Sequence, residues 1–311
     1  MESKKLIVTA SPHITNHTST RGLMLNVCIA LLPALVASTL IFGARALLVT
    51  GVTVAACVGF EALYCVVMKK PVPVGDFSAV VTGMILAFNL PATIPLWIAI
   101  IGAFVAIVVA KQLFGGLGFN FANPALLGRI VLFIGFAGRM TTYGFPKTTG
   151  VDAFTSATPL VAGNSMAGKD MLLQLLLGAH GGVLGETCAV ALILGGIYLI
   201  ATKTISAAIP LSYIGTVAVL SLVLGQDVVL QLFSGGLLLG AFFMATDYVT
   251  SPFTFTGRIV YGVCLGVITC IIRFYGNMAE GVSFALLLMN LLVPYINDLT
   301  RQKPLGGAKA K

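Results

Sequence analysis

A short run of small hydroxyl side chains ahead of a proline marks a place where the chain could carry a covalent group. Residues 155–158 read Thr-Ser-Ala-Thr, and Pro159 follows them directly. The small side chains of Ser156 and Ala157 leave the hydroxyl of Thr158 open to a bulky partner. Because a residue before proline favours extended backbone, Thr158 is expected to project from an extended segment. The run therefore indicates an attachment point at Thr158, although Thr155 and Ser156 could equally cap a turn before the proline.

A second candidate site is the glycine-rich segment 115–125, which reads GGLGFNFANPA. Its glycines allow backbone to approach a flat ligand, and the amides of Asn120 and Asn123 can pair with polar ring edges. Pro124 suits the first turn of a following helix. The alternative is a re-entrant turn whose asparagines satisfy free backbone groups at membrane depth. The segment thus predicts either a pocket for a flat ring system or a structural turn.

Three acidic residues, Glu61, Glu186 and Asp247, lie within or beside apolar segments. Ionisable groups in such places are costly and usually face a cavity or a partner, so each is a candidate for an ion path. The structural alternatives are ion pairs with Arg129 and Arg258, or a helix-terminal role for the acids.

None of the other polar residues is predicted to be a metal ligand or a catalytic residue. His180 has no second His or Cys at ligand spacing and is interpreted as a loop or interface residue, while Glu280, at a segment edge, is interpreted as interfacial. The six cysteines all lie inside apolar segments and form no CxxC pair or ligand cluster. There is also no glycine-rich turn of the nucleotide-binding kind in a soluble context.

The composition predicts that the chain is a membrane protein, whose apolar helices must position these residues. The chain has 311 residues, of which 58% are hydrophobic and 9% charged, with a mean hydropathy of +1.03. Roughly 20 apolar residues suffice to cross a bilayer. The net charge of +8 sits mostly at the ends of apolar segments, where orientation explains it, so we expect contact with membrane lipid and none with nucleic acid. Residues 1–22 are polar and lack the apolar core and cleavage site of a signal peptide, so insertion should begin with the first span.

Ten apolar segments in two groups of five predict an all-α polytopic fold. They are 23–43, 46–68, 77–90, 95–113, 124–138, 184–202, 205–225, 227–245, 257–275 and 280–297. Segments 77–90 and 124–138 are too short to cross at roughly 1.5 Å per helical residue, which indicates broken or tilted helices. Asn-Pro followed by Gly-Arg-Ile-Val at 123–131 recurs as Ser-Pro and Gly-Arg-Ile-Val at 251–260. Repeated halves with broken helices are typical of transporter folds, so we expect about ten transmembrane helices in two repeated halves.

The distribution of basic residues predicts the orientation. If the N-terminus is cytoplasmic, Lys69, Lys70, Lys203 and Arg301 also lie on that side, as the positive-inside rule requires, although Arg45, Arg139, Lys147 and Lys169 fall on the other. The expected parts are a cytoplasmic segment 1–22, a first membrane half 23–138, an extracytoplasmic attachment interval 139–183, a second membrane half 184–297 and a cytoplasmic basic tail 298–311.

These motifs resemble those of a known family. Asp152, Thr155, Ser156, Ala157 and Thr158 fill in order the flavinylation motif in which FMN is joined through its phosphate to the last hydroxyl. From Ser11-Pro12-His13 to Asn290 the chain resembles the RnfD proteins of Rnf complexes and the related NqrB proteins of sodium-pumping NADH:quinone reductases. The resemblance implies covalent FMN on Thr158 and associates the segment with Asn120 and Asn123 with a second, non-covalent flavin, riboflavin.

The resemblance further implies a multi-pass subunit of the cytoplasmic membrane that is not an enzyme alone. It would pass electrons within a ferredoxin:NAD⁺ oxidoreductase complex that moves Na⁺ or H⁺. Its partners would be the ferredoxin-, NAD- and iron-sulfur-carrying subunits, with a flavin transferase needed for maturation. From the residues alone, a cofactor-free channel or permease with the same repeat fold is an alternative, and an assembly scaffold without electron traffic is a third.

Overall fold

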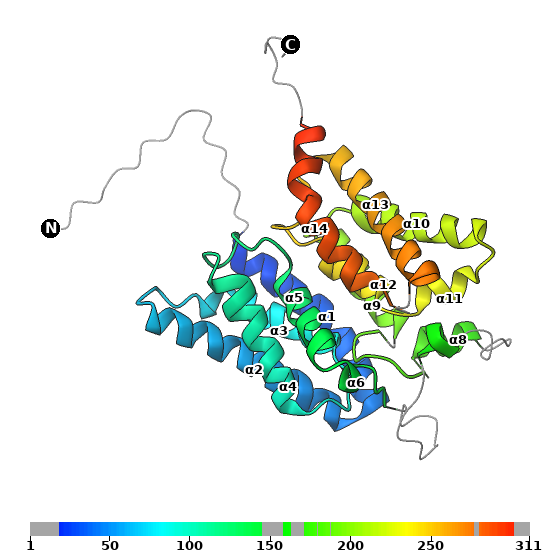
Figure 1. The fold of residues 1–311 in the computed structure, drawn as a ribbon. Coiled ribbons are helices and arrows are strands. Elements are labelled where there is room, and N and C mark those ends of the chain that lie inside the picture. The colour runs from blue at the N-terminus through cyan, green and yellow to red at the C-terminus, as the bar shows by residue number, and fades with distance from the viewer. Residues whose placement is uncertain are drawn as a thin grey trace, which may run out of the picture.

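The computed structural model describes residues 19–144, 158–162, 171–178, 180–186, 188–276 and 280–301, and within these ranges the fold is helical (Figure 1). An isolated antiparallel bridge joins Pro91 to Val183, and the described ranges contain no β-strand. The first half comprises α1 (Thr20–Phe42), α2 (Ala44–Val67), η1 (Val74–Asp76), α3 (Ser78–Phe88), α4 (Leu96–Phe104), η2 (Val105–Gln112), α5 (Pro124–Gly135) and α6 (Ala137–Met140). Then follow α7 (Pro159–Ala162), α8 (Met171–Leu177), α9 (Ala189–Ala201), α10 (Ala208–Val223), α11 (Val228–Phe233), α12 (Leu237–Leu239), η5 (Gly240–Met244), α13 (Phe255–Tyr275) and α14 (Val282–Leu299).

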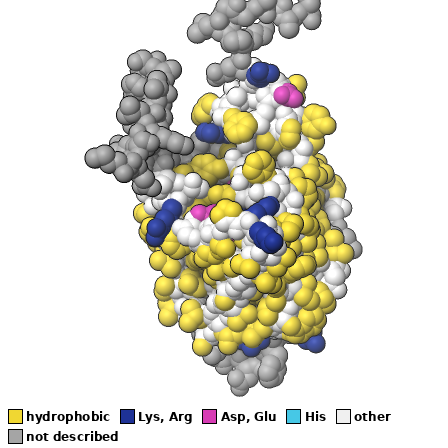
Figure 2. All heavy atoms as spheres, turned by 90° about the vertical axis from the view of Figure 1, so that its left-hand side faces the viewer, with side chains coloured by type: hydrophobic (Ala, Val, Ile, Leu, Met, Phe, Trp, Pro, Cys, Tyr) yellow, Lys and Arg dark blue, Asp and Glu magenta, His cyan; other side chains and the backbone are white. Residues whose placement is uncertain are grey.

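Helix length confirms an all-α polytopic membrane protein. Four helices, α1, α2, α13 and α14, are each long and apolar enough to cross a membrane. Shorter apolar helices lie between them, among them α3 with 11 residues and α5 with 12, as expected for the two short segments. In Figure 2 apolar side chains cover most of the lower part of the face shown, and Lys and Arg side chains lie above and at its lower edge.

The third segment of the second half is broken, whereas that of the first half is a single short helix. Helix α3 ends at Phe88, and the chain continues without helix to Pro95. The expected single segment 227–245 is instead divided into α11 and the continuous helical stretch of α12 and η5, with the break at residues 234–236. The glycine pair Gly235-Gly236 explains this break, because Gly235 adopts a left-handed φ of 67° that ends the helix.

The two halves run in opposite directions through the protein. Asn26, near the start of α1, donates from Nδ2 to Oγ1 of Thr204, which follows the end of α9, at 3.3 Å. Further along, Gly195 of α9 lies against the carbonyl of Ala30 in α1. Helices α1 and α9 are therefore antiparallel neighbours. The start of α1 and the end of α14 lie on the same face (Figure 1), called the terminal face below.

The repeated Gly-Arg-Ile-Val sequence does not mark the register of the repeat. Its two copies open α5, the fifth spanning segment of the first half, and α13, the fourth of the second half. Helix packing pairs α2 with α4 and α10 with α13, so α13 corresponds to α4. The tetrapeptide is therefore not evidence for the two repeated halves expected from the sequence.

Candidate functional site

Thr158 lies directly before α7 and is half-buried. The other residues of its motif, Asp152, Thr155, Ser156 and Ala157, lie outside the described residues. Two positions on, Leu160 packs against the break between α11 and α12: a Cβ added to Gly235 would lie 2.8 Å from Leu160 Cδ1 and 3.0 Å from Arg273 Nη2. The proposed attachment point is therefore next to a helix break.

Arg273 of α13 satisfies the backbone groups that this break leaves free. Its Nη1 donates to the carbonyl of Gln231 at 2.7 Å and its Nη2 to that of Ser234 at 3.4 Å. Its Nε donates to the carbonyl of Glu280 at 3.2 Å. Non-helical backbone within a membrane protein needs such internal partners, because lipid offers none. Arg273 thus holds the break and the start of α14 together.

A buried charge cluster lies beside the same break. Arg129 of α5 contacts Glu186 at 3.7 Å and forms a closer ion pair with Glu280. Its Nη1 donates to Asn89 Oδ1 at 2.8 Å and to Ser283 Oγ at 2.7 Å. The pairing of Arg129 with Glu186 is the structural alternative considered from the sequence. Glu280, expected to be interfacial, is instead a partner of Arg129.

Glu61 also has a buried cationic partner. Its Oε1 lies 2.6 Å from Lys111 Nζ, and both side chains are almost fully buried, at 0% and 3% exposure. Gln112 Nε2 donates to the same oxygen at 2.8 Å, and Lys111 Nζ donates to Ser78 Oγ at 2.6 Å. Lys111 and Gln112 come from η2, a π-helical stretch of the kind that often occurs at functional sites.

Asn120, Asn123 and Asp247, which are far apart in sequence, line one pocket of about 330 Å³ on the terminal face. Lys111 lines it as well. Its apolar walls come from both halves of the protein, from Met24, Val27, Val81, Ile85, Phe242 and Phe243. A mainly apolar pocket with a few polar groups at its edge is the usual form of a site for a flat organic ligand.

The polar side chains of this pocket also make local hydrogen bonds. Asn123 caps α5 by accepting from Ala125 N at 3.1 Å, and Asn120 Nδ2 donates to Ala122 O at 3.0 Å. Both asparagines therefore perform the structural task considered above, while still lining the pocket. Asp247 accepts from Thr250 Oγ1 at 3.1 Å in the connection before α13; burial raises the pKa of its carboxyl, and that hydrogen bond opposes the rise.

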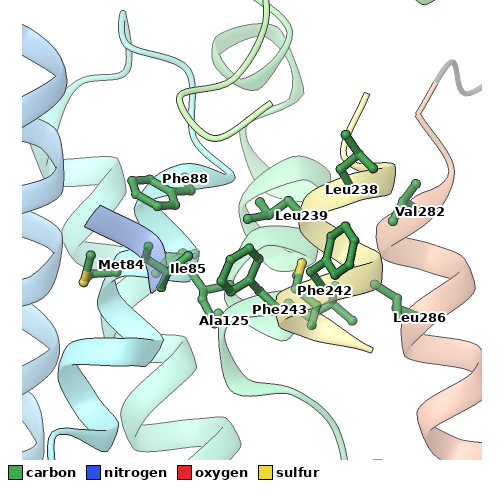
Figure 3. Close-up of a cluster of buried hydrophobic side chains, with 14 of the residues drawn as sticks. Met84, Ile85, Phe88, Ala125, Leu238, Leu239, Phe242, Phe243, Val282 and Leu286 are labelled. Carbon is green, nitrogen blue, oxygen red and sulfur yellow. The ribbon is translucent and has the colours of Figure 1, made fainter. Parts of the chain in front are cut away.

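A layer of apolar side chains lies between the pocket and the Arg129 cluster. Figure 3 shows Ile85 and Phe88 of α3 facing Leu239 and Phe243 on the helical stretch formed by α12 and η5. Ile85 and Phe243 line the pocket on one side of this layer. On its other side, Phe88 packs against Gly185, the neighbour of Glu186. The two polar regions are thus kept apart by side chains of α3 and of the helical stretch formed by α12 and η5.

Lys111, Arg273 and the role of Glu280 were not predicted from the sequence. For Lys111 a signal was available, since a cation inside an apolar segment needs a buried acid as its partner. Arg258, considered as a partner for the acids, instead donates from Nε to Pro252 O at 3.2 Å, and the described residues give it no ion pair. Within the described residues no group of three His, Cys, Asp or Glu side chains could hold a metal ion.

Comparison with known proteins gives a consistent result along the chain. The family model of the NQR2, RnfD, RnfE family matches residues 7–306. The D component of the Na⁺-translocating ferredoxin:NAD⁺ oxidoreductase complex of Acetobacterium woodii is 45% identical over 315 residues, covering 100% of this chain and 98% of the relative. The D component of the proton-translocating ferredoxin:NAD⁺ oxidoreductase complex of Clostridium ljungdahlii is 40% identical over 316 residues, covering 96% of each. The D component of an ion-translocating oxidoreductase complex of Stutzerimonas stutzeri is 37% identical over 328 residues, covering 93% of each.

Proposed function

The chain belongs to the NQR2, RnfD, RnfE family, and from this premise we propose that it acts as the flavin-carrying membrane component of an Rnf-type ferredoxin:NAD⁺ oxidoreductase complex. The relatives that carry the name of that component align with this chain over nearly their whole length. In this role the protein is part of a redox-driven translocase. The subunits that carry ferredoxin, NAD and iron–sulfur sites would be its partners, because the chain has no sequence motif for such a site.

FMN is proposed to be joined through its phosphate to Thr158. The observation that carries this proposal is the placement of Thr158, half-buried, directly before α7 and beside the α11–α12 break. There the neighbouring Leu160 anchors the segment to the membrane part, so that the group would stay close to the protein. Bound FMN would supply the one-electron chemistry, and the chain would supply its position. A flavin transferase is required to make the bond.

The pocket on the terminal face is proposed to hold riboflavin. Its apolar walls suit the flat ring system, and the amides of Asn120 and Asn123 suit the polar edge of the ring. Lys111 also lines the wall, where its charge is balanced by the buried carboxylate of Glu61. The ribityl chain could meet the hydroxyl-bearing and acidic part of the lining near Thr246 and Asp247.

Glu61, Glu186 and Asp247 are proposed to serve the path of the coupling ion, Na⁺ or H⁺. Asp247 lines the pocket, Glu61 borders it through Lys111, and Glu186 lies on the far side of the apolar layer. Glu186 Oε1 and Glu61 Oε2 are buried and have no hydrogen-bond partner among the described residues. Carboxylate oxygens with spare lone pairs are suited to take up a small cation or a proton.

The decisive test of flavin attachment is Thr158→Ala in a host that flavinylates its own proteins. We expect the variant chain to insert normally but to lose the added mass of FMN less water and the ultraviolet-excited fluorescence of the denatured band. Thr149→Ala, in the same interval but outside the motif, is the matched control and should retain a flavin. An unmodified wild-type Thr158 peptide, or full flavin content in Thr158→Ala, would sink this assignment and favour a cofactor-free permease.

A further inference from the structure

A second pocket, of about 270 Å³, lies on the terminal face beside the proposed riboflavin pocket. It is formed where α9 ends, α10 begins and α13 begins, and it shares Ile205, Thr246 and Tyr248 with its neighbour. The Tyr248 hydroxyl donates to the carbonyl of Thr204, which fixes the wall between the two. Unlike its neighbour, this pocket contains two cationic side chains, Lys203 and Arg258.

Within the described residues, no acidic group balances the charge of this pocket. No acidic side chain lines it, and neither Lys203 nor Arg258 forms an ion pair with a described residue. Arg258 uses Nε for the carbonyl of Pro252 at 3.2 Å, so its two terminal amino groups are available. Ser206 and Ser251 add hydroxyl groups to the lining. Arginine, lysine and hydroxyl donors together are a set that recognises phosphate oxygens.

The surroundings of the pocket match the depth of a lipid headgroup. Its cations lie at the ends of membrane helices, where headgroups are found. On the helices that form it, apolar side chains are exposed: Ile197 of α9 at 56%, Leu211 of α10 at 69% and Ile259 of α13 at 39%. Acyl chains attached to a headgroup in the pocket would meet this apolar surface. Basic pockets between membrane helices are known to take anionic lipid headgroups.

We propose that this pocket binds the headgroup phosphate of an anionic phospholipid, with Lys203 and Arg258 as its cationic contacts. Ser206 and Ser251 would donate hydrogen bonds to the remaining phosphate oxygens. The site is independent of either flavin, since it needs only the membrane location and the described side chains. It would tie the ends of α9, α10 and α13 together next to the riboflavin pocket.

The test is native mass spectrometry of the full chain in detergent, titrated with phosphatidylglycerol or phosphatidylcholine. Wild type should bind phosphatidylglycerol on the order of tenfold more tightly than phosphatidylcholine. Lys203→Gln/Arg258→Gln should lose this preference. The matched control Arg21→Gln/Lys69→Gln should keep it: it removes the same charge from the same face, and Lys69 ends α2 in the left-handed conformation (φ 53°) just as Lys203 ends α9 (φ 55°).

Two further arms decide the source of the phosphate and guard against misfolding. If millimolar inorganic phosphate displaces phosphatidylglycerol, or if both lipids bind wild type equally, the lipid assignment is overturned. Lys203→Gln alone changes only an exposed side chain and should still weaken the preference several-fold, so it decides the question even if the double variant does not fold. An unaltered preference in Lys203→Gln and in the double variant would also overturn the proposal.

Discussion

At the scale of single residues, the buried pair of Glu61 and Lys111 is costly to form. Each side chain is almost completely removed from solvent, and together they are 2.6 Å apart. Gln112 and Ser78 supply additional hydrogen bonds to the pair. A buried ion pair is tolerated when such partners satisfy it, whereas removing one partner leaves an uncompensated charge. The pair therefore fixes α2, α3 and η2 relative to one another.

Replacing the cation of this pair should be strongly destabilising. Lys111→Met leaves Glu61 buried without its counter-charge, and we expect a loss of about 3–5 kcal/mol, seen as a lower melting temperature in detergent. Glu61→Gln/Lys111→Met, which removes both charges, should recover much of that loss. Lys69→Met, at an exposed lysine, is the control and should melt as wild type does. A Lys111→Met chain with an unchanged melting temperature would contradict the proposed weight of the pair.

At this scale the sequence predicts which acids are costly to bury, but not which residues they contact in the folded protein. Glu61 was predicted as a site residue because an acid in an apolar segment is costly to bury. Its partner, Lys111, lies 50 positions away in another helix. Asn120, Asn123 and Asp247 came from two separate motifs, and only folding brings them to one pocket. Residue type and local spacing predict the cost of burying a group, whereas the identity of its partner depends on tertiary packing.

At the scale of helices, the contact between the two halves depends on small residues. Gly195 of α9 lies so close to α1 that an added Cβ would come within 2.2 Å of the carbonyl oxygen of Ala30 and 2.9 Å of Phe243 Cζ. Because the first of these neighbours is backbone, it cannot turn aside as a side chain would. Any larger residue at 195 must push α9 away from α1 and disturb the wall that Phe243 gives to the proposed riboflavin pocket.

Gly195→Ala should therefore lower stability and weaken riboflavin retention together. Overpacking of this kind costs typically about 1–3 kcal/mol, and the backbone contact places the expected loss at the upper end. Gly215→Ala is the control: it lies in α10 with nothing within 4 Å of the added Cβ. That change should be neutral or stabilising by roughly 0.5–1 kcal/mol, since alanine is the better helix former. Melting curves and the flavin content of the purified variants measure both effects, and equal values for the two variants would refute close packing at 195.

The helix breaks show what the sequence could predict about elements. Pro91 and Pro95 predicted the end of α3, and Asn123-Pro124 predicted the start of α5. The break at 234–236 was hidden inside a run that is apolar on both sides, where hydropathy alone reads as one helix. The glycine pair was the available signal. Its effect depends on Arg273, from a distant helix, to satisfy the carbonyls that the break exposes.

At the scale of the whole molecule, the two proposed flavins lie on opposite faces. The riboflavin pocket is on the terminal face, lined by Thr20 at the start of α1 and Tyr248. Thr158 is on the other side of the apolar layer, near the α11–α12 break and the Arg129 cluster. If both proposals hold, electrons passing between the flavins would cross the layer formed by α3, α12 and η5, next to which Glu186 lies. In the proposed function, electron flow and ion movement would therefore share a set of elements, α3 with α12 and η5.

The same arrangement predicts which side of the membrane the basic residues Lys203 and Arg139 face. Lys203 lies on the terminal face, through the contact of Thr204 with Asn26, whereas the exposed Arg139 of α6 lies at the opposite end. If the terminal face is cytoplasmic, as the positive-inside rule favours, Arg139→Cys should react with an impermeant thiol reagent in right-side-out vesicles, and Lys203→Cys only in inverted ones. The unaltered chain, whose cysteines in the structure are all buried or half-buried, gives the background. The reverse labelling pattern would place Thr158 in the cytoplasm, away from any extracytoplasmic flavin transferase, and would overturn the proposed orientation without changing the fold.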